Sequence, residues 1–244
     1  PLVYHSYLCA ISSSAISSIV ISSDSEQILA NPGYIRWEGQ LRPPELAEDN
    51  TPIWDVIRYV LARREEEEGL RYSYVVLLEP TSPCRKPEWV SEALQLLKDS
   101  PHADGVHGIS LTPFNPIWNC LVEREGYLDY LVPQGRFYHR RQDVPPTYRM
   151  DGSLHIWRAR FVREREGGYH WGQHVGYKTN PEWACSIDTL EDFEAWSRRL
   201  RGGWSSCHGC ERTADTCDRR QRPRRARPGG GPAGRRRPGG GHRP

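Results

Sequence analysis

The stretch YVVLLEPTSPCR, residues 74–85, decides the predicted fold of this chain. Its first five residues, 74–78, form a continuous apolar run of strand length, which is typical of a strand buried on both faces. The polar turn that follows leads into residues 89–97, whose apolar spacing predicts an amphipathic helix, and residues 105–111 predict another short strand. Strand, helix and strand at these lengths are typical of βαβ units. We therefore predict an α/β fold, with a mostly parallel sheet and helices on both faces.

The residues before this stretch predict two helices and a strand. Residues 2–15 have apolar positions at helical spacing, and the β-branched residues 16–21 predict a buried strand that ends in a polar cluster. Within that cluster, Asp24 or Ser25 can cap a short helix over residues 26–30, although such clusters also form ligand loops in α/β folds. We expect the cap.

The pattern on either side of the central stretch completes the prediction. Residues 52–64 carry an i, i+3, i+4 stripe that predicts a helix, and the glutamates at 65–68 predict its solvated end. Residues 118–148 are rich in tyrosine and broken by glycine and proline, which predicts a hairpin excursion away from the sheet. Regular structure resumes at residues 152–157, and residues 189–200 predict a closing helix.

Charge and composition divide the chain into two predicted domains, residues 1–200 and 201–244. Residues 202–244 carry 11 arginines against three acidic residues, and no Leu, Ile, Val, Met, Phe or Tyr follows Leu200. Such a segment cannot bury enough apolar surface to offset the entropy of ordering, so we predict a disordered Arg/Gly/Pro-rich tail. A basic tail can bind nucleic acid, but this one lacks interleaved aromatic residues, so we do not expect that partner.

Cysteine usage and hydropathy limit the class of protein. Cys207, Cys210 and Cys217 supply only half of a zinc site, so we expect no structural zinc. The other four cysteines are scattered through apolar surroundings and predict packed, reduced thiols. No apolar run approaches eighteen residues and the chain opens without a secretory signal pattern, so we predict a cytoplasmic protein without a membrane span.

Five segments carry recognisable motifs in a fixed order. They are VISSDS at 20–25, RPPELAED at 42–49, LLEPTSPCR at 77–85, YRMDGSLHI at 148–156 and SIDTLEDF at 186–193. Together they resemble the acylneuraminate cytidylyltransferase family, which contains the CMP-sialic acid synthetases and their bacterial relatives. The resemblance covers residues 1 to about 200 and implies a Rossmann-like nucleotidyltransferase fold with a protruding hairpin that forms a homodimer.

The resemblance also implies a reaction. Family members couple CTP to a nonulosonic acid, a nine-carbon 2-keto sugar acid, and release pyrophosphate. The anomeric hydroxyl attacks the α-phosphorus in line, so the enzyme must position the reactants and neutralise charge on the phosphate oxygens. A divalent metal, Mg²⁺ in this family, supplies charge stabilisation and suits hard oxygen ligands such as a carboxylate.

Carried over residue by residue, the motifs imply a set of site residues. Asp188 and Arg149 are the implied catalytic residues, with Asp188 also the metal ligand. The implied substrate-binding residues are Arg42, Glu79, Thr81, Ser82, Arg85, Asp151, Gly152 and His155. Several of these have structural alternatives: Thr81 and Ser82 as turn caps, His155 as a satisfied core histidine, and Asp188 as a helix cap. Asp192 is expected at the helix terminus.

The sequence departs from the family motifs at defined positions. Ser186 stands where the family has an aspartate, Glu79 where it has glutamine, Asp151 where it has asparagine and His155 where it has tyrosine. The family's Gly-, Arg- and Lys-rich phosphate loop would precede Pro1, so we expect the chain as given to be an N-terminally truncated, catalytically silent fragment. Three alternatives follow: a relative that binds nucleotide or sugar without turnover, an enzyme for another 2-keto sugar acid, and an anion-binding protein acting through its tail.

Overall fold

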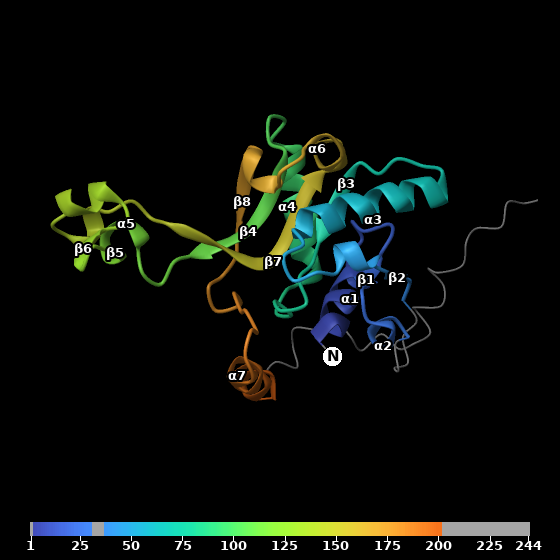
Figure 1. The fold of residues 1–244 in the computed structure, drawn as a ribbon, viewed down its shortest axis with the longest axis horizontal. Helices are drawn as coiled ribbons and strands as arrows, with labels where there is room; N and C mark the ends of the chain where they lie inside the picture. Colours follow the sequence, from blue (N-terminus) through green and yellow to red (C-terminus); the bar gives the residue numbers. More distant parts are fainter. Residues whose placement is uncertain (1, 31–36, 202–244) are drawn as a thin grey trace, which may run out of the picture. The chain divides into compact units, whose positions relative to one another are not determined.

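The computed structural model describes residues 2–30 and 37–201 (Figure 1). The chain divides into two units, residues 1–203 and 204–244, and all of the described residues lie in the first. The predictions of a disordered tail and of no zinc at its cysteines fall outside the described residues. Within them, no helix is both long enough and apolar enough to cross a membrane.

The centre of the fold is a four-stranded sheet with the order β3-β7-β4-β8. Its strands are β3 (Tyr74–Leu77), β7 (Tyr148–Arg158), β4 (Gly105–Leu111) and β8 (His174–Lys178). β4 and β8 pair in parallel, whereas β7 runs antiparallel to both β3 and β4. The α/β class is confirmed, but the sheet is mixed, because one long antiparallel strand is inserted between strands that share a direction.

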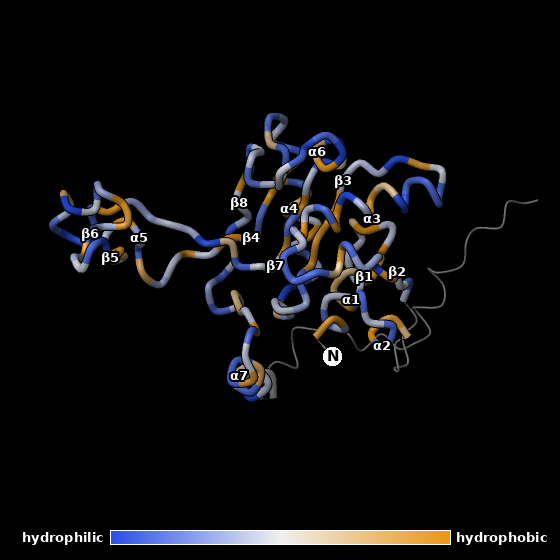
Figure 2. The backbone as a smooth tube through the Cα atoms, viewed as in Figure 1, coloured by the Kyte–Doolittle hydropathy of each residue, from blue (hydrophilic) through white to orange (hydrophobic). Residues whose placement is uncertain are grey.

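Helices cover both faces of this sheet, as predicted. Helices α1 (Leu2–Ser12) and α4 (Pro87–Lys98) lie on one face, and α3 (Ile53–Glu68) and α6 (Ala159–Glu164) lie on the other. Figure 2 shows the apolar segments of these helices and strands gathered together. Because successive side chains of a strand point to opposite faces, Ile156 packs toward α4 while its neighbour Trp157 packs toward α3.

The C-terminal end of α3 corrects one expectation. Glu65 is 7% exposed, so it does not belong to a solvated helix end. Its carboxylate accepts hydrogen bonds from Arg71 at 2.8 Å, Arg163 at 2.6 Å and the backbone N–H of Tyr72 at 2.9 Å. Position 65 continues the buried side of the helix four residues beyond Leu61, and the basic partners compensate for the burial of its charge.

The N-terminal part forms a separate two-stranded parallel sheet from β1 (Ile21–Ser23) and β2 (Gly39–Leu41). The strand predicted over 16–21 is therefore wrong in its extent, since only Ile21 of that run is in a strand. α2 (Glu26–Leu29) begins after Ser25, whose hydroxyl accepts from the N–H of Ile28 and confirms the predicted cap. A 3-10 turn, η1 (Pro44–Leu46), follows β2.

The predicted hairpin is present as a third, two-stranded sheet made by β5 (Leu121–Arg124) and β6 (Tyr127–Tyr130). Glu125 and Gly126 both have positive φ, 54° and 82°, as two-residue hairpin turns of the primed type require. α5 (Pro116–Asn119) and η2 (Pro133–Phe137) pack beside it, beyond the ends of β4 and β7 (Figure 1). The remaining elements are two short 3-10 turns, η3 (Arg141–Asp143) and η4 (Tyr169–Trp171), and the last helix, α7 (Leu190–Arg201).

Candidate active site

An enlarged bulge in β7, with four residues opposite one of β4, positions the residues of the candidate site. His107 of β4 pairs with His155 of β7, and the register then resumes at Ile109. Between these pairs β4 contributes Gly108 alone, whereas β7 contributes residues 151–154. The extra residues cannot remain in the ladder, so the β7 backbone bends away from β4. Bulges of this kind re-aim side chains next to functional sites.

Gly152 lies within this bulge and contacts the turn that follows β3. Its φ is +68°, and a Cβ at this position would lie 2.5 Å from Oγ of Ser82 and 2.8 Å from Oε2 of Glu79. Only glycine fits both the backbone conformation and the space. The hydroxyl of Ser82, itself buried, donates to the carbonyl of Asp151 at 3.2 Å, so the turn and the bulge are joined directly.

Arg85 joins the same two segments to α1. Its guanidinium donates to Oγ of Ser6 at 2.8 Å, to the carbonyl of Gly152 at 3.4 Å and to the carbonyl of Glu79. The side chain is 5% exposed, and burial lowers the pKa of the guanidinium. Because the side chain is buried and its Nη1 and Nη2 donate to these protein groups, Arg85 has a structural role in this arrangement. Its predicted contact with substrate stays a prediction.

Asp151 has a structural role of the same kind, and its predicted contact with substrate likewise stays a prediction. It is 5% exposed, and its carboxylate accepts from the backbone N–H of Ser153 at 3.0 Å and from the hydroxyl of Thr179. Thr179 in turn donates its backbone N–H to the carbonyl of Ile109 at 2.8 Å. Asp151 therefore fixes the bulge against the segment after β8, and Thr179 is a site-forming residue that the sequence motifs do not reveal.

The segment that carries Asp188 is attached to the same turn. The backbone N–H of Ile187 donates to the carbonyl of Thr81 at 2.8 Å, and the hydroxyl of Ser186 donates to Oδ2 of Asp188 at 2.8 Å. Asp188 itself is exposed. This contact brings the segment of the implied metal ligand to the turn that follows β3.

Asp188 does not cap α7. The cap is made by Thr189 and Asp192, whose carboxylate accepts from the N–H and the hydroxyl of Thr189 at 2.9 and 2.8 Å. The N–H of Asp192 donates back to that hydroxyl at 3.1 Å, which completes a capping box. These bonds lower the pKa of Asp192, and they leave the Asp188 carboxylate available for a ligand.

The donor set around Asp188 permits one way of holding Mg²⁺. No group of three or more His, Cys, Asp or Glu side chains in the described part of the chain could form a metal cage. Mg²⁺ is commonly held by one or two carboxylates together with substrate phosphates and waters. The exposed carboxylate of Asp188 fits a metal that arrives with a nucleotide.

The two remaining predicted arginines differ in position. Arg149 is exposed on β7, and its guanidinium lies 3.4 Å from the carbonyl of Ala184, beside the segment that carries Asp188. Arg42 follows β2, where its guanidinium donates to the carbonyl of Ser22 at 3.3 Å. No hydrogen bond within the described ranges connects Arg42 or Arg149 directly to another candidate, and Arg149 adjoins the cluster only through Ala184, on the segment that carries Asp188.

Two buried histidines extend the cluster into the sheet. His155 is 4% exposed, and its Nε2 lies 3.4 Å from Oε1 of Glu79, while its Nδ1 lies 2.6 Å from Nδ1 of His107. Burial, with smaller contributions from His155 and His174, lowers the pKa of His107 to about 3. His107 was not predicted; the signal available was a histidine in an otherwise apolar strand, on the face opposite Val106.

Of the candidate residues, Arg149 and Asp188 are exposed, whereas Ser82, Arg85, Asp151 and His155 are buried. A cavity of about 620 Å³ is lined by Arg58, Glu65, Arg71 and Arg163, and contains none of the predicted residues. That cavity surrounds the buried ion pairs of Glu65. The assignment of the site therefore rests on the hydrogen bonds between segments and not on the shape of a cavity.

Solved structures identify the class of fold. The chain matches a CMP:2-keto-3-deoxy-manno-octonic acid synthetase, solved in complex with CTP, with a TM-score of 0.57 and 13% identity over 82% of this chain and 88% of that one. It also matches the 4-diphosphocytidyl-2C-methyl-D-erythritol synthase of Anaerococcus prevotii, with a TM-score of 0.51 and 12% identity over 82% and 86%. The fold is that of the Rossmann-like nucleotidyltransferases, as predicted.

Curated relatives show which nucleotidyltransferases the sequence resembles. The chain is 28% identical to the N-acylneuraminate cytidylyltransferase of Streptococcus agalactiae serotype V over 199 residues, covering 79% of this chain and 45% of that protein. It is 28% identical to the CMP-N,N'-diacetyllegionaminic acid synthase of Legionella pneumophila over 177 residues, covering 69% and 72%. No family model matches the chain. The resemblance to the acylneuraminate cytidylyltransferases is confirmed, and the chain spans about half the length of the streptococcal relative.

Proposed function

We propose that the protein is a cytidylyltransferase that couples CTP to a nonulosonic acid, forming the CMP-sugar and pyrophosphate. The observation that carries the proposal is the meeting of three motif segments: the turn after β3, the Gly152 bulge and the segment of Asp188. The relatives that the chain resembles are named for this kind of activity. The matched region, 199 residues with the streptococcal relative and 177 with the Legionella relative, resembles enzymes along its whole length.

The exposed members of the cluster have roles that follow from their chemistry. Arg149 offers a guanidinium fork that suits a carboxylate or a phosphate. Glu79, whose side chain is 40% exposed, offers an acceptor to the hydroxyl groups of a sugar. Positioning of this kind accounts for much of catalysis in phosphoryl-group chemistry, because the reacting oxygen must lie in line with the phosphorus. The buried members, Ser82, Arg85 and Asp151, hold the exposed ones in place.

The proposed cofactor is Mg²⁺, held on the protein side by Asp188. Bound with the nucleotide, the metal would neutralise phosphate charge. Ser186 already donates to Oδ2 of Asp188, so the protein contributes one carboxylate and one hydroxyl where the family motif has two carboxylates. We therefore propose weaker metal binding than in relatives that have both aspartates.

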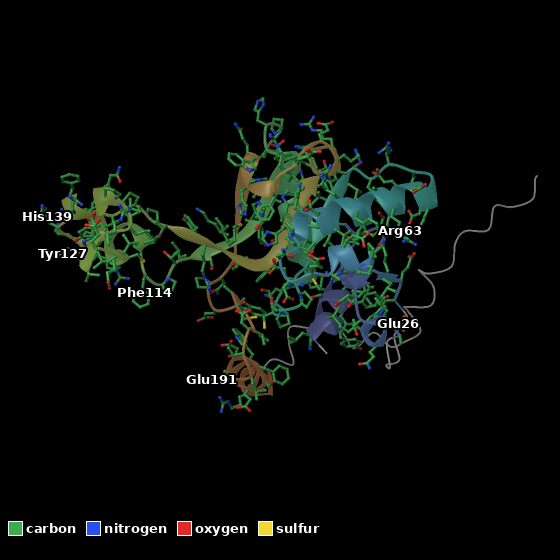
Figure 3. All side chains as sticks on the ribbon, viewed as in Figure 1. Glu26, Arg63, Phe114, Tyr127, His139 and Glu191 are labelled. Atoms are coloured by element: carbon green, nitrogen blue, oxygen red, sulfur yellow. The ribbon has the colours of Figure 1, made fainter. Side chains whose placement is uncertain are left out.

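The proposed assembly is a homodimer formed through the hairpin. Large apolar side chains are exposed around it, two of which are labelled in Figure 3: Phe114, Leu121, Tyr127, Leu128, Leu131 and Phe137. Exposed apolar patches of this kind mark association surfaces. Replacing Tyr127 with glutamate should shift the protein to the monomer in analytical ultracentrifugation, whereas His139→Glu on the same unit should not.

The proposed site of action is the cytoplasm. The described cysteines Cys9, Cys84, Cys120 and Cys185 form no disulfide, which suits a reducing compartment. Cell fractionation tests the location directly.

The test of function uses protein expressed from the complete reading frame, including any residues that its gene encodes before Pro1. It is incubated with CTP, Mg²⁺ and, separately, a sialic, a legionaminic, a pseudaminic and an eight-carbon 2-keto sugar acid. We expect pyrophosphate and a CMP-sugar with at least one nonulosonic acid and none with CTP alone. Tight binding of CTP without turnover would support the binding-only relative instead. If the protein neither binds CTP nor turns it over, the proposal is overturned.

A further inference from the structure

The feature that the proposed function does not absorb is the chain of contacts from His107 through His155 to Glu79. It starts on β4, passes through β7 and ends at the partly exposed carboxylate in the turn after β3. His107 is 5% exposed, so it is almost completely shielded from solvent. It does not contact the exposed candidates. Its effect on the site must therefore pass through His155.

The short distance between the two imidazoles restricts their protonation. Their Nδ1 atoms are 2.6 Å apart, so one of them carries a proton and donates it, and the other is bare. Nε2 of His155 faces the Glu79 carboxylate at 3.4 Å, which favours a proton on that nitrogen. In a neutral His155 the Nδ1 is then bare, and His107 must donate through its own Nδ1–H.

The rings around the pair hold both imidazoles in these orientations. His155 stacks on Trp157, with ring centroids 5.7 Å apart and planes at 13°. His107 packs edge to face against His174 at 4.5 Å and against Trp157 at 5.7 Å. Nε2 of His174 lies 2.5 Å from the carbonyl of Tyr169, so that nitrogen carries a proton and His174 presents no second proton to the pair.

We propose that His107 is a positioning residue, which donates to His155 and thereby keeps the Nε2–H of His155 directed at the Glu79 carboxylate. The proposal rests on the proposed function for its effect on turnover, since Glu79 is expected to accept hydrogen bonds from the sugar acid. Without the donor on β4, Nδ1 of His155 is left buried without a partner. The ring of His155 is then held by Glu79 alone, so it can rotate and its Nε2–H points less directly at the carboxylate.

Two variants separate the donor from the bulk of the ring. His107→Asn keeps an N–H donor close to the position of Nδ1, whereas His107→Leu has a similar shape and no donor. His139→Asn, a change at an exposed residue that follows the hairpin, serves as the control. Circular dichroism and thermal melting of each variant show whether it is folded before it is compared.

The first readout is the tautomer state of the histidines in the ligand-free 244-residue chain, measured by long-range ¹H–¹⁵N NMR. We expect the Nδ1–H form for His107 and the Nε2–H form for His155. The Nε2–H form of His155 should persist in both variants, because Glu79 favours it, whereas the ¹⁵N shift of Nε2 should stay unaltered in His107→Asn and change in His107→Leu. The Nδ1–H form of His155 in the unaltered protein, or an unchanged Nε2 shift of His155 in His107→Leu, overturns the proposal. Because this readout needs no turnover, it is independent of the proposed function.

The second readout is kinetic and uses the complete reading frame. We expect His107→Leu to raise the KM for the sugar acid about tenfold, the scale of one lost hydrogen bond, with the KM for CTP unchanged. His107→Asn should recover most of that loss. An equal rise in both KM values, or no rescue by asparagine, overturns the positioning role. An unaltered protein without turnover overturns the proposed function alone.

Discussion

The two faces of the central sheet are built from the same strands but differ in chemistry. Toward α4, strands β4 and β7 present Val106, Leu154 and Ile156, all fully buried and apolar. Toward α3 and α6, the intervening positions present His107 and His155 beside a second apolar cluster that includes Trp157. Strand alternation thus keeps one face of these strands apolar and places two buried polar side chains within the core on the other. Changes on the two faces should therefore have separable effects.

The largest loss of stability is expected on the apolar face. Leu154 is 0% exposed, so Leu154→Ala removes buried methyl groups and leaves a cavity against α4. We expect the free energy of unfolding to fall by about 2–5 kcal/mol, measured by urea denaturation. Leu190→Ala is the control, because Leu190 is 73% exposed, and it should change by less than about 0.5 kcal/mol. Equal losses of unfolding free energy in Leu154→Ala and Leu190→Ala would contradict the assignment of stability to the apolar face.

A smaller loss is expected for the buried charge at the end of α3. Glu65→Ala leaves the N–H of Tyr72 and the guanidinium of Arg163 without their acceptor. We expect a loss of about 1–3 kcal/mol in the same denaturation experiment. The adjacent Glu66 is exposed, so Glu66→Ala should be nearly neutral. A neutral Glu65→Ala would show that the solvated helix end predicted from the sequence describes the protein better.

The polar face should give stability a distinct dependence on pH. The pKa of His107 is about 3 in the folded protein, below its ordinary value of about 6.5 in an unfolded chain. Below pH 6.5 the unfolded chain therefore binds a proton that the folded one excludes. Stability should fall from pH 6.5 toward pH 3, with a slope of at most about 1.4 kcal/mol per unit from this group, and be unaffected above pH 6.5.

Denaturation between pH 4.5 and 8 measures this slope. His107→Asn should flatten it, because no group remains there to take up a proton. The exposed His139 provides the control, since His139→Asn should leave the slope as it is. An unchanged slope in His107→Asn would assign the acid sensitivity to other groups.

The smallest change in stability is expected at Asp188, away from both faces. Asp188 is exposed and α7 is capped by Thr189 and Asp192, so Asp188→Asn should alter stability by less than about 0.5 kcal/mol. Turnover by protein from the complete reading frame should nevertheless fall by about 100-fold or more. Ser186→Asp should lower the Mg²⁺ concentration needed for half-maximal activity. If Asp188→Asn keeps near-normal turnover at saturating Mg²⁺ and CTP, Asp188 is not a residue of the active site.

Local patterns predicted most of the elements but not their pairing. The strand over 105–111 has the predicted bounds, because its apolar run is interrupted sharply at both ends. The antiparallel direction of β7 could not be predicted, since nothing in its own residues specifies the neighbours between which it lies. Glu65 was misjudged for a similar reason: its partners Arg71 and Arg163 come from other segments.

The motifs predicted which segments form the candidate site better than they predicted each residue's role. Glu79, Arg149 and Asp188 are at least partly exposed, as ligand-binding residues must be. Arg85 and Asp151 lie in the same motifs yet are buried in hydrogen bonds to other segments. A motif reports that a residue type is needed at a position, and burial, which depends on the whole fold, determines whether it contacts protein or ligand.

The β7 bulge has a consequence for redesign of the protein. Residues 151–154 lie between two correctly paired stretches of the ladder, so their number is decoupled from the register on either side. Lengthening or shortening this loop by one residue would not transfer the side chains of Ile156 and Trp157 to the wrong faces, as it would in a regular strand. Changes in the length of the bulge that retain Asp151, Gly152 and the buried Leu154 are therefore the economical route to altered acceptor specificity, with the core left intact.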